Sequence, residues 1–185
     1  MALKATVYKA ELQISDMDRH YYATHALTLA QHPSETAGRL MVRVLAFALF
    51  AHERLAFGRG VSTDDEPDLW RRALTGEIEQ WIDLGQPEEP RIRRACGRAR
   101  AVVVIGYAGR SFGLWWDKHA AALARCGNLS VIELPAGTAD ALAALFSRGM
   151  LLQCLIQDGE LQLISEKGVV TVTPVLHQAI ASPAR

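Results

Sequence analysis

"EIEQWIDLGQPEEPRIRRACGRARAVVVIGY", residues 77–107, predicts a strand, a turn, a helix and a second strand in that order. The helical part, residues 88–100, carries an apolar stripe formed by Ile92, Ala95, Cys96 and Ala99. The run at residues 101–107 is almost entirely apolar, which is typical of a strand covered on both faces. Because helices alternate with buried strands in this way, we expect a sheet that is partly parallel, with right-handed crossovers.

The N-terminal part predicts a hairpin followed by a long helix. Residues 3–15 and 20–30 alternate between polar and apolar side chains, with a turn signal between them. After Pro33, apolar residues recur at helical spacing as far as Leu49, and we expect Ser34 to be the N-cap of this helix. Its strongly apolar face predicts a place at the centre of the core.

The C-terminal part continues the alternation of helices and strands. Ser111 is predicted to cap a helix, a buried strand is expected at residues 128–135, and another helix at residues 137–149. An Asp158-Gly159 turn between alternating segments predicts a further hairpin. The fold class that follows is α/β, a mixed β-sheet with flanking helices.

Composition narrows the class of protein. The 185 residues suit one domain, residues 1–185, and half of them are apolar. The 20 basic residues equal the 20 acidic ones, which argues against sequence-blind nucleic-acid binding by the whole surface but allows a local basic patch. The three cysteines form no C-x-x-C pair, and we expect them to be reduced. With no long apolar segment, we expect a cytoplasmic protein without a membrane partner.

The acidic stretch at residues 64–87 is the candidate for chemistry. Asp68 follows a proline, and Asp83 lies in the strand candidate. If residues 70–79 reverse the chain, both carboxylates reach one pocket, with Glu35 at the start of the long helix as a third acid. Carboxylate oxygens are ligands of hard cations such as Mg²⁺, which polarise phosphate and generate hydroxide.

A structural interpretation of the same acids stays open. An aspartate before a proline and more acids is also what the start of a helix looks like. Asp is depleted from strands, but an exposed edge position would explain Asp83. Asp64, Asp65 and Glu66 are expected in the turn that leads to Asp68, with Asp65 as the alternative acid of the first strand.

Longer segments carry a resemblance to a known family. They are "MALKATVYKAELQISDMDR", "LTLAQHPSET", "DDEPDLW", "QWIDLGQPEEPRIRRAC" and "NLSV". On these segments the chain resembles the YaeQ family of bacterial proteins over nearly its whole length. The resemblance implies a variant of the PD-(D/E)xK nuclease fold, as in restriction endonucleases. It implies less about activity, because no biochemical function is established for the family.

The resemblance also implies a set of site residues. Glu35, Asp68 and Asp83 match the three acids of the nuclease pattern, and they would bind Mg²⁺ or Mn²⁺. The sequence departs from the pattern at Gly85, where a lysine is expected. Arginines of the following helix, Arg93 and Arg94 among them, are candidates to replace that lysine, although they also fit a solvated helix boundary. Arginine binds phosphate but does not accept a proton near neutral pH.

Two functions follow from this set. The first is a metal-dependent nuclease or phosphodiesterase that acts on nucleic acid. The alternative is a catalytically inactive binding or regulatory module with a protein or nucleic-acid partner, which the missing lysine and the zero net charge favour.

Overall fold

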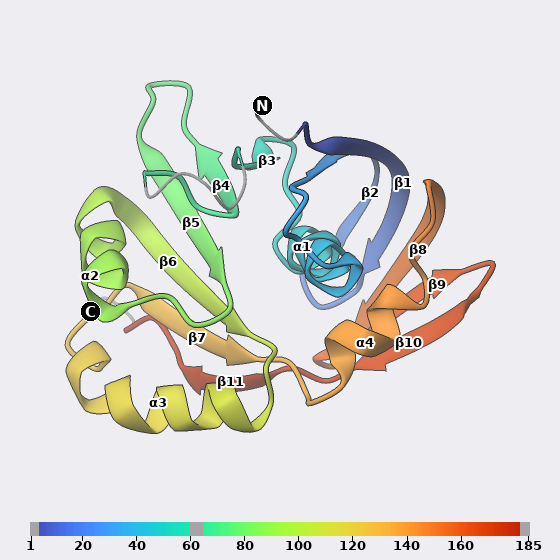
Figure 1. Cartoon of the computed structure of the whole chain (residues 1–185). Helices are drawn as coiled ribbons and strands as arrows, with labels where there is room; N and C mark the ends of the chain where they lie inside the picture. The colour runs from blue at the N-terminus through green and yellow to red at the C-terminus, as the bar shows by residue number, and fades with distance from the viewer. Residues whose placement is uncertain (1–3, 60–64, 182–185) are drawn as a thin grey trace.

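The computed structural model describes residues 4–59 and 65–181 of the chain (Figure 1). In chain order its helices and strands are β1 (Thr6–Asp16), β2 (Tyr21–Gln31), α1 (Ala37–Leu49), β3 (Leu55–Phe57), β4 (Leu69–Arg72), β5 (Ile78–Leu84), α2 (Glu89–Arg98), β6 (Ala99–Gly106), α3 (Arg110–Leu123), β7 (Leu129–Glu133), α4 (Thr138–Ala143), β8 (Gly149–Gln157), β9 (Glu160–Ser165), β10 (Gly168–Val172) and β11 (Val175–Gln178). The α/β class is confirmed. The described strands form two mixed sheets, however, and not the single sheet that we expected.

The first sheet has five strands in the order β10-β9-β8-β1-β2. β1 and β2 form the predicted antiparallel hairpin, and the predicted turn at Asp158-Gly159 joins β8 to β9. β8 returns parallel to β1, with Leu152 beside Leu12. Because alternate residues of a strand point to opposite faces, β1 buries one set of side chains and leaves the other set exposed.

The second sheet has six strands in the order β11-β7-β6-β5-β4-β3. Its centre confirms the prediction from residues 77–107, since β5 and β6 are parallel and α2 connects them. β6 and β7 are also parallel, and α3 connects them. β3, β4 and β5 are antiparallel, so the acidic hairpin extends the sheet on one side.

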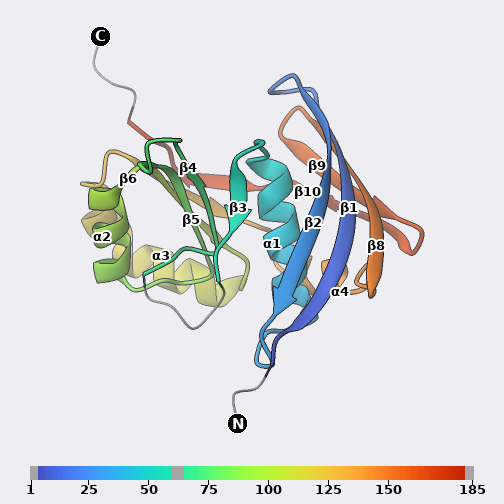
Figure 2. The same ribbon diagram turned by 90° about the horizontal axis from the view of Figure 1, so that it is seen from above.

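The apolar core lies in two places. The larger cluster surrounds α1, which Figure 2 shows between the two sheets. The smaller cluster lies on the other face of the six-stranded sheet, below α2 and α3, and contains Trp81 and Phe112. α1 therefore holds the two sheets together, and α2 and α3 cover the outer face of one of them.

The predicted N-caps of two helices are wrong. α1 begins two residues later than expected, and its N-cap is Thr36. The Thr36 Oγ1 accepts a hydrogen bond of 3.1 Å from the backbone N–H of Arg39. The Ser34 hydroxyl instead contacts the ring of His32 at 2.6 Å. α3 begins at Arg110 after Gly109, whose φ of 56° lies in the left-handed region. Ser111 lies inside α3, and its hydroxyl contacts the side chain of Gln86.

The helix predicted for residues 137–149 is shorter than expected. α4 ends at Ala143, and Gly149 already begins β8. Among the described residues, no helix is long and apolar enough to cross a membrane.

Candidate functional site

Asp68 and Asp83 lie side by side along the backbone, as the reversal at residues 70–79 predicts. β4 and β5 are antiparallel, with Leu69 opposite Ile82. Asp68 directly precedes β4, and its Oδ2 accepts a hydrogen bond of 2.8 Å from the backbone N–H of Leu84. This bond fixes the first acid against the end of β5.

The two carboxylates are held from opposite faces of the six-stranded sheet. Asp83 points to the same face as Trp81, which packs in the cluster below α2 and α3. Asp68 is bound by a side chain of α1, which packs in the other cluster. The acids that the sequence predicts in one pocket therefore meet different helices.

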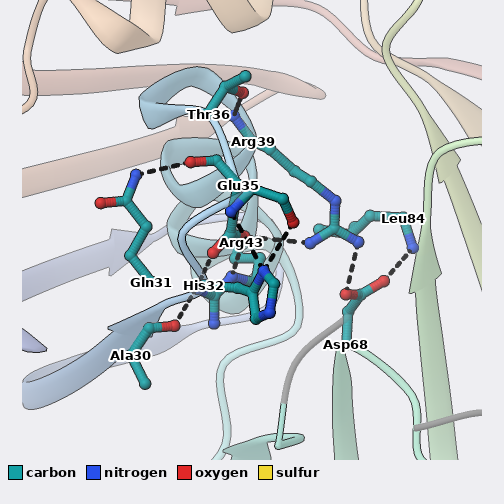
Figure 3. A network of polar contacts seen from close by, with 10 residues as sticks. Ala30, Gln31, His32, Glu35, Thr36, Arg39, Arg43, Asp68 and Leu84 are labelled. Carbon is teal, nitrogen blue, oxygen red and sulfur yellow. Dashed lines mark hydrogen bonds and ion pairs between the residues drawn. The ribbon is translucent and has the colours of Figure 1, made fainter. Parts of the chain in front are cut away.

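Glu35 and Asp68 are joined by an arginine that lies between them (Figure 3). Arg39 Nη1 donates to Glu35 Oε1 at 3.1 Å, and Arg39 Nη2 donates to Asp68 Oδ1 at 2.7 Å. The side chains of Glu35 and Asp68 are 3% and 10% exposed, so both carboxylates are nearly withdrawn from water. The Arg39 guanidinium occupies the space that a cation shared by these two acids would need.

A second arginine completes this network. Arg43 lies one turn beyond Arg39 on α1, and its Nε and Nη2 donate to the two oxygens of Glu35 at 2.9 and 2.8 Å. Its side chain is only 3% exposed. Arg43 also donates to the backbone carbonyl of Ala30 on β2, at 2.8 Å. Two carboxyl groups thus face two guanidinium groups, which balances the buried charge.

The neighbouring Tyr107 is part of the same environment. Burial is the main reason why the pKa of Tyr107 lies above its ordinary value, while Arg39 acts in the opposite direction. Burial by itself would lower the pKa of Arg39, but the charge and hydrogen bond of Asp68 raise it above its ordinary value. Arg39 is therefore charged, and Tyr107 is neutral, over the physiological pH range.

Asp83 forms a separate ion pair with Arg91 of α2. Arg91 Nε and Nη2 donate to the two carboxylate oxygens at 2.8 and 2.9 Å, which is bidentate geometry. Asp83 is 3% exposed and β5 lies between β4 and β6, so the interpretation as an exposed edge residue is wrong. Arg91 also donates to the backbone carbonyl of Glu66, at 2.9 Å. The ion pair thereby ties α2 to the segment that leads to Asp68.

Among the described residues, neither of the two arginines predicted as lysine replacements contacts Glu35, Asp68 or Asp83. Arg93 is exposed and pairs with Glu89 of its own helix at 2.7 Å. Arg94 is exposed as well. Their neighbour Arg91, on the same helix, is the one that reaches a predicted acid.

Sequence reasoning missed Arg39 and Arg43. Both follow Glu35 at multiples of four residues, and from successive turns of α1 they reach back to this acid, which directly precedes the N-cap. A charged residue inside the apolar run "LMVRVLAFA" was the available signal, because a buried arginine requires a buried acid.

Asp65 and Glu66 precede Asp68 in the segment that leads to β4. Asp65 is exposed, and its backbone carbonyl accepts a hydrogen bond of 3.4 Å from Arg98. Glu66 accepts a hydrogen bond of 3.0 Å from the backbone N–H of Arg59. Asp64 lies outside the described residues. Of the described acids that precede β4, Asp68 is thus the one whose side chain binds the backbone of β5.

The arrangement does not fit Mg²⁺ or Mn²⁺ without a rearrangement. Mg²⁺ requires several oxygen ligands at about 2.1 Å around one point. Glu35, Asp68 and Asp83 each direct oxygens toward arginine, and Asp83 lies on the opposite face of the sheet. Over residues 4–59 and 65–181, no group of three or more His, Cys, Asp or Glu side chains could hold a metal ion.

Comparison with known proteins agrees with this architecture. The model of a family described as "YaeQ protein" matches residues 1–174. The YaeQ protein of Salmonella typhi is 46% identical over 163 residues, covering 88% of this chain and 90% of its own. The YaeQ protein of Escherichia coli (strain K12) is 42% identical over 172 residues, covering 93% and 95%.

Two crystal structures are also similar. The YaeQ protein from Xanthomonas axonopodis pv. citri has a TM-score of 0.92 at 63% identity and covers 95% of this chain and 99% of its own. The YaeQ protein from Pseudomonas syringae has a TM-score of 0.90 at 32% identity and covers 95% and 97%. The chain therefore belongs to the YaeQ family.

Proposed function

We propose that the protein is a non-catalytic binding module built on a variant of the PD-(D/E)xK nuclease core, and that it binds nucleic acid. The observation that carries the proposal is that each acid of the nuclease-type set is bound by arginine: Glu35, Asp68 and Asp83. The placement in the nuclease superfamily rests on the resemblance of the sequence. A location in the cytoplasm is part of the same proposal.

The ion pairs favour a structural role for these acids. A guanidinium group neutralises a carboxylate, but it does not generate hydroxide from water as a bound metal ion does. Removing one partner of a buried ion pair costs about 3–5 kcal/mol, because the other charge stays buried. Glu35 and Arg43 are both 3% exposed, so this cost applies to them. Acids that hold the fold together in this way are poorly suited to exchange arginine for a metal ion.

A local basic surface favours nucleic acid as the partner. α2 exposes Arg94 and Arg98, whereas Arg91 and Arg93 are already paired with acids. The Arg98 guanidinium lies 5.3 Å from the ring centroid of Trp81. Guanidinium groups of this kind bind phosphate oxygens in bidentate fashion, and phosphate contacts supply most of the affinity in sequence-independent binding.

The basic surface continues onto the β4–β5 hairpin. Trp81 contacts Trp70 edge to face, with ring centroids 6.4 Å apart. The guanidinium of the exposed Arg72 lies 4.4 Å from the ring centroid of Trp70. Arg72 and Arg98 thus lie over two tryptophans that contact each other, and Arg94 is exposed on the same helix as Arg98. Several exposed guanidinium groups in one region suit a backbone of regularly spaced phosphates.

Fluorescence anisotropy with labelled single- and double-stranded DNA and RNA tests the proposal. We expect binding at low salt that weakens as salt rises, and that is insensitive to chelators. The Arg94→Glu and Arg98→Glu double variant should lose affinity at least tenfold, which is about 1.4 kcal/mol. Arg148→Glu, on the exposed loop before β8, reverses a charge far from α2 and is the control. An equal loss of affinity in the Arg148→Glu variant, or no binding of the wild type at low salt, would contradict the proposal.

A second candidate is the Mg²⁺- or Mn²⁺-dependent nuclease. The observation that favours it is that Asp68 and Asp83 flank the same end of the β4–β5 hairpin. It requires Arg39 and Arg91 to release their carboxylates. Calorimetric titration with Mn²⁺ and incubation with plasmid and single-stranded substrates decide between the two functions. Metal binding together with cleavage that Asp68→Asn and Asp83→Asn both abolish, in variants with wild-type circular dichroism, would establish the nuclease.

A further inference from the structure

Two of the three cysteines meet at the surface of the six-stranded sheet, away from the acids. Cys96 lies in the last turn of α2, and Cys126 lies in the loop that joins α3 to β7. The two side chains pack against the same core cluster, and Cys126 is close enough to contribute to the raised pKa of Cys96. Both residues are half-buried at the edge of the smaller core cluster, so a small reagent can reach them.

The segments that carry the two cysteines are fastened together by the side-chain amide of Asn128. Asn128 Nδ2 donates to the carbonyl of Cys96 and to that of Ala99, both at 3.0 Å, which fastens the loop to the end of α2. The Cys126 N–H donates to the carbonyl of Leu123 at 2.9 Å, and its carbonyl accepts from Leu129 at 3.2 Å. The loop that carries Cys126 is therefore held against the end of α2, which carries Cys96.

We propose that Cys96 and Cys126 form a reversible dithiol–disulfide site that reacts with low-molecular-weight disulfides. This proposal does not rest on the proposed nucleic-acid binding. One thiolate attacks a sulfur of the small disulfide, forming a mixed disulfide and releasing a small thiolate. The second cysteine then attacks its partner's sulfur in that mixed disulfide, which forms the Cys96–Cys126 bond and releases a second small thiolate. The protein loses two electrons, the small disulfide gains them, and the two thiol protons pass to the released thiolates.

The surroundings of the pair set the pace of these steps. Burial, together with the neighbouring Cys126, raises the pKa of Cys96 to about 12. Because the thiolate is the attacking species, Cys96 is a slow first nucleophile. We expect the disulfide to form over minutes to hours, at the slow end of such reactions.

The disulfide would restrain the helix that carries the basic surface. α2 contributes Arg91 to the ion pair with Asp83 and exposes Arg94 and Arg98. A covalent bond from its last turn to the α3–β7 loop opposes any movement of this helix away from the sheet. Oxidation therefore stabilises the arrangement of α2 seen in Figure 1.

Cys154 provides an internal control. It lies in β8 of the five-stranded sheet and is 1% exposed. Burial raises its pKa to about 12 as well. It shares neither the neighbouring thiol nor the access of the other two cysteines, so it should remain a free thiol.

Thiol counting on the intact protein tests the proposal. After incubation with oxidised glutathione, the three free thiols measured in denaturant should fall to one, and the mass should fall by two hydrogen atoms. Peptide mapping should recover a cross-link between Cys96 and Cys126, and the oxidised protein should melt at a higher temperature until a reducing agent is added. Cys154→Ser should still lose two thiols.

The cysteine variants complete the test. Cys126→Ser and, independently, Cys96→Ala should abolish the intramolecular cross-link, and either one suffices if the other fails to fold. Three thiols that remain free after a day of exposure would overturn the proposal. A cross-link that contains Cys154 or joins two molecules would overturn it too.

Discussion

Asp83 is a buried carboxylate in the middle of a sheet, and a single arginine makes this position possible. The bidentate contact from Arg91 supplies both oxygens with charged donors, which offsets the cost of removing the carboxylate from water. The sequence shows that Asp83 is unusual, because aspartate is depleted from strands. It does not show which of five arginines between residues 91 and 100 is the partner, since that depends on how α2 packs on β5.

The Asp83–Arg91 pair leads to a prediction about stability. Asp83→Asn should lower the free energy of unfolding by about 3 kcal/mol, because the charge of Asp83, which accepts two hydrogen bonds from Arg91, is removed from a largely buried ion pair. Combining Asp83→Leu with Arg91→Met should recover much of this loss. Urea denaturation of Asp83→Asn, Asp83→Leu, Arg91→Met and the double variant measures both effects, and the last three form a double-mutant cycle with the wild type. The exposed pair on the same helix supplies the control, and Glu89→Gln should have little effect. An Asp83→Asn effect no larger than that of Glu89→Gln would contradict the structural role.

A half-buried histidine predicts how stability depends on pH. Burial lowers the pKa of His25 below its ordinary value of 6.5, and its ring contacts Tyr21 and Phe47. The folded protein thus favours the neutral ring, whereas the unfolded chain takes up a proton near pH 6.5. The contribution of neutral His25 to the free energy of unfolding is complete above about pH 6.5 and is lost as the pH falls below that value. His25→Leu should therefore show a shallower decline of unfolding free energy on acidification, and parallel pH profiles would contradict this account.

At the level of elements, hydrophobic periodicity predicted most helices and strands, and local chemistry misplaced their ends. Ser34 looks like an N-cap, but the backbone N–H of Glu35 donates to the carbonyl of His32, and this turn delays the helix until Thr36. Several residues near each helix start can cap it, and the competition is decided by the preceding turn. The sequence alone therefore predicts that a helix is present more reliably than the residue at which it begins.

Two glycines that look equivalent in the sequence should respond in opposite ways. A Cβ at Gly106, the end of β6, would overlap the buried ring of Phe112 on α3. Gly106→Ala should therefore cost about 1–3 kcal/mol, because the α3–sheet contact has no free space. Gly113 lies inside α3, and an added Cβ there would meet nothing within 4 Å, so Gly113→Ala should stabilise by about 0.5–1 kcal/mol. Thermal denaturation of both variants measures whether each change raises or lowers stability. A change in the same direction for both would show that α3 packs differently.

At the scale of the whole molecule, the division into two sheets is what the sequence analysis missed. Alternating strands and helices predict adjacent strands, but they do not say where one sheet ends and another begins. The feature that indicates two sheets is α1, whose residues from Leu40 to Ala48 are all buried. A helix that is covered on every side needs a layer on each face, and the two sheets provide these layers (Figure 2). Arg43 is a buried charge on this helix, so its counter-charge has to lie in the space between the two sheets as well.

Arg39 links the two halves of the molecule, and this leads to the last prediction. It extends from α1 to Asp68, which in turn accepts the N–H of Leu84 at the end of β5. Arg39→Met should lower the free energy of unfolding by about 3 kcal/mol, because Asp68 loses its counter-charge while the Glu35–Arg43 pair persists. The Leu84 amide should exchange its hydrogen faster, since its acceptor is no longer anchored.

A matched variant separates this link from a general loss of charge. Arg54 pairs with Glu79 at 3.0 Å within the region of the six-stranded sheet and contacts neither α1 nor Asp68. Arg54→Met removes the same charge but should leave exchange at Leu84 unchanged. If both variants accelerate Leu84 equally, the protection of this amide comes from the sheet as a whole. If only Arg39→Met does so, the acid that the nuclease pattern reserves for a metal ion serves here as the fastening between α1 and the six-stranded sheet.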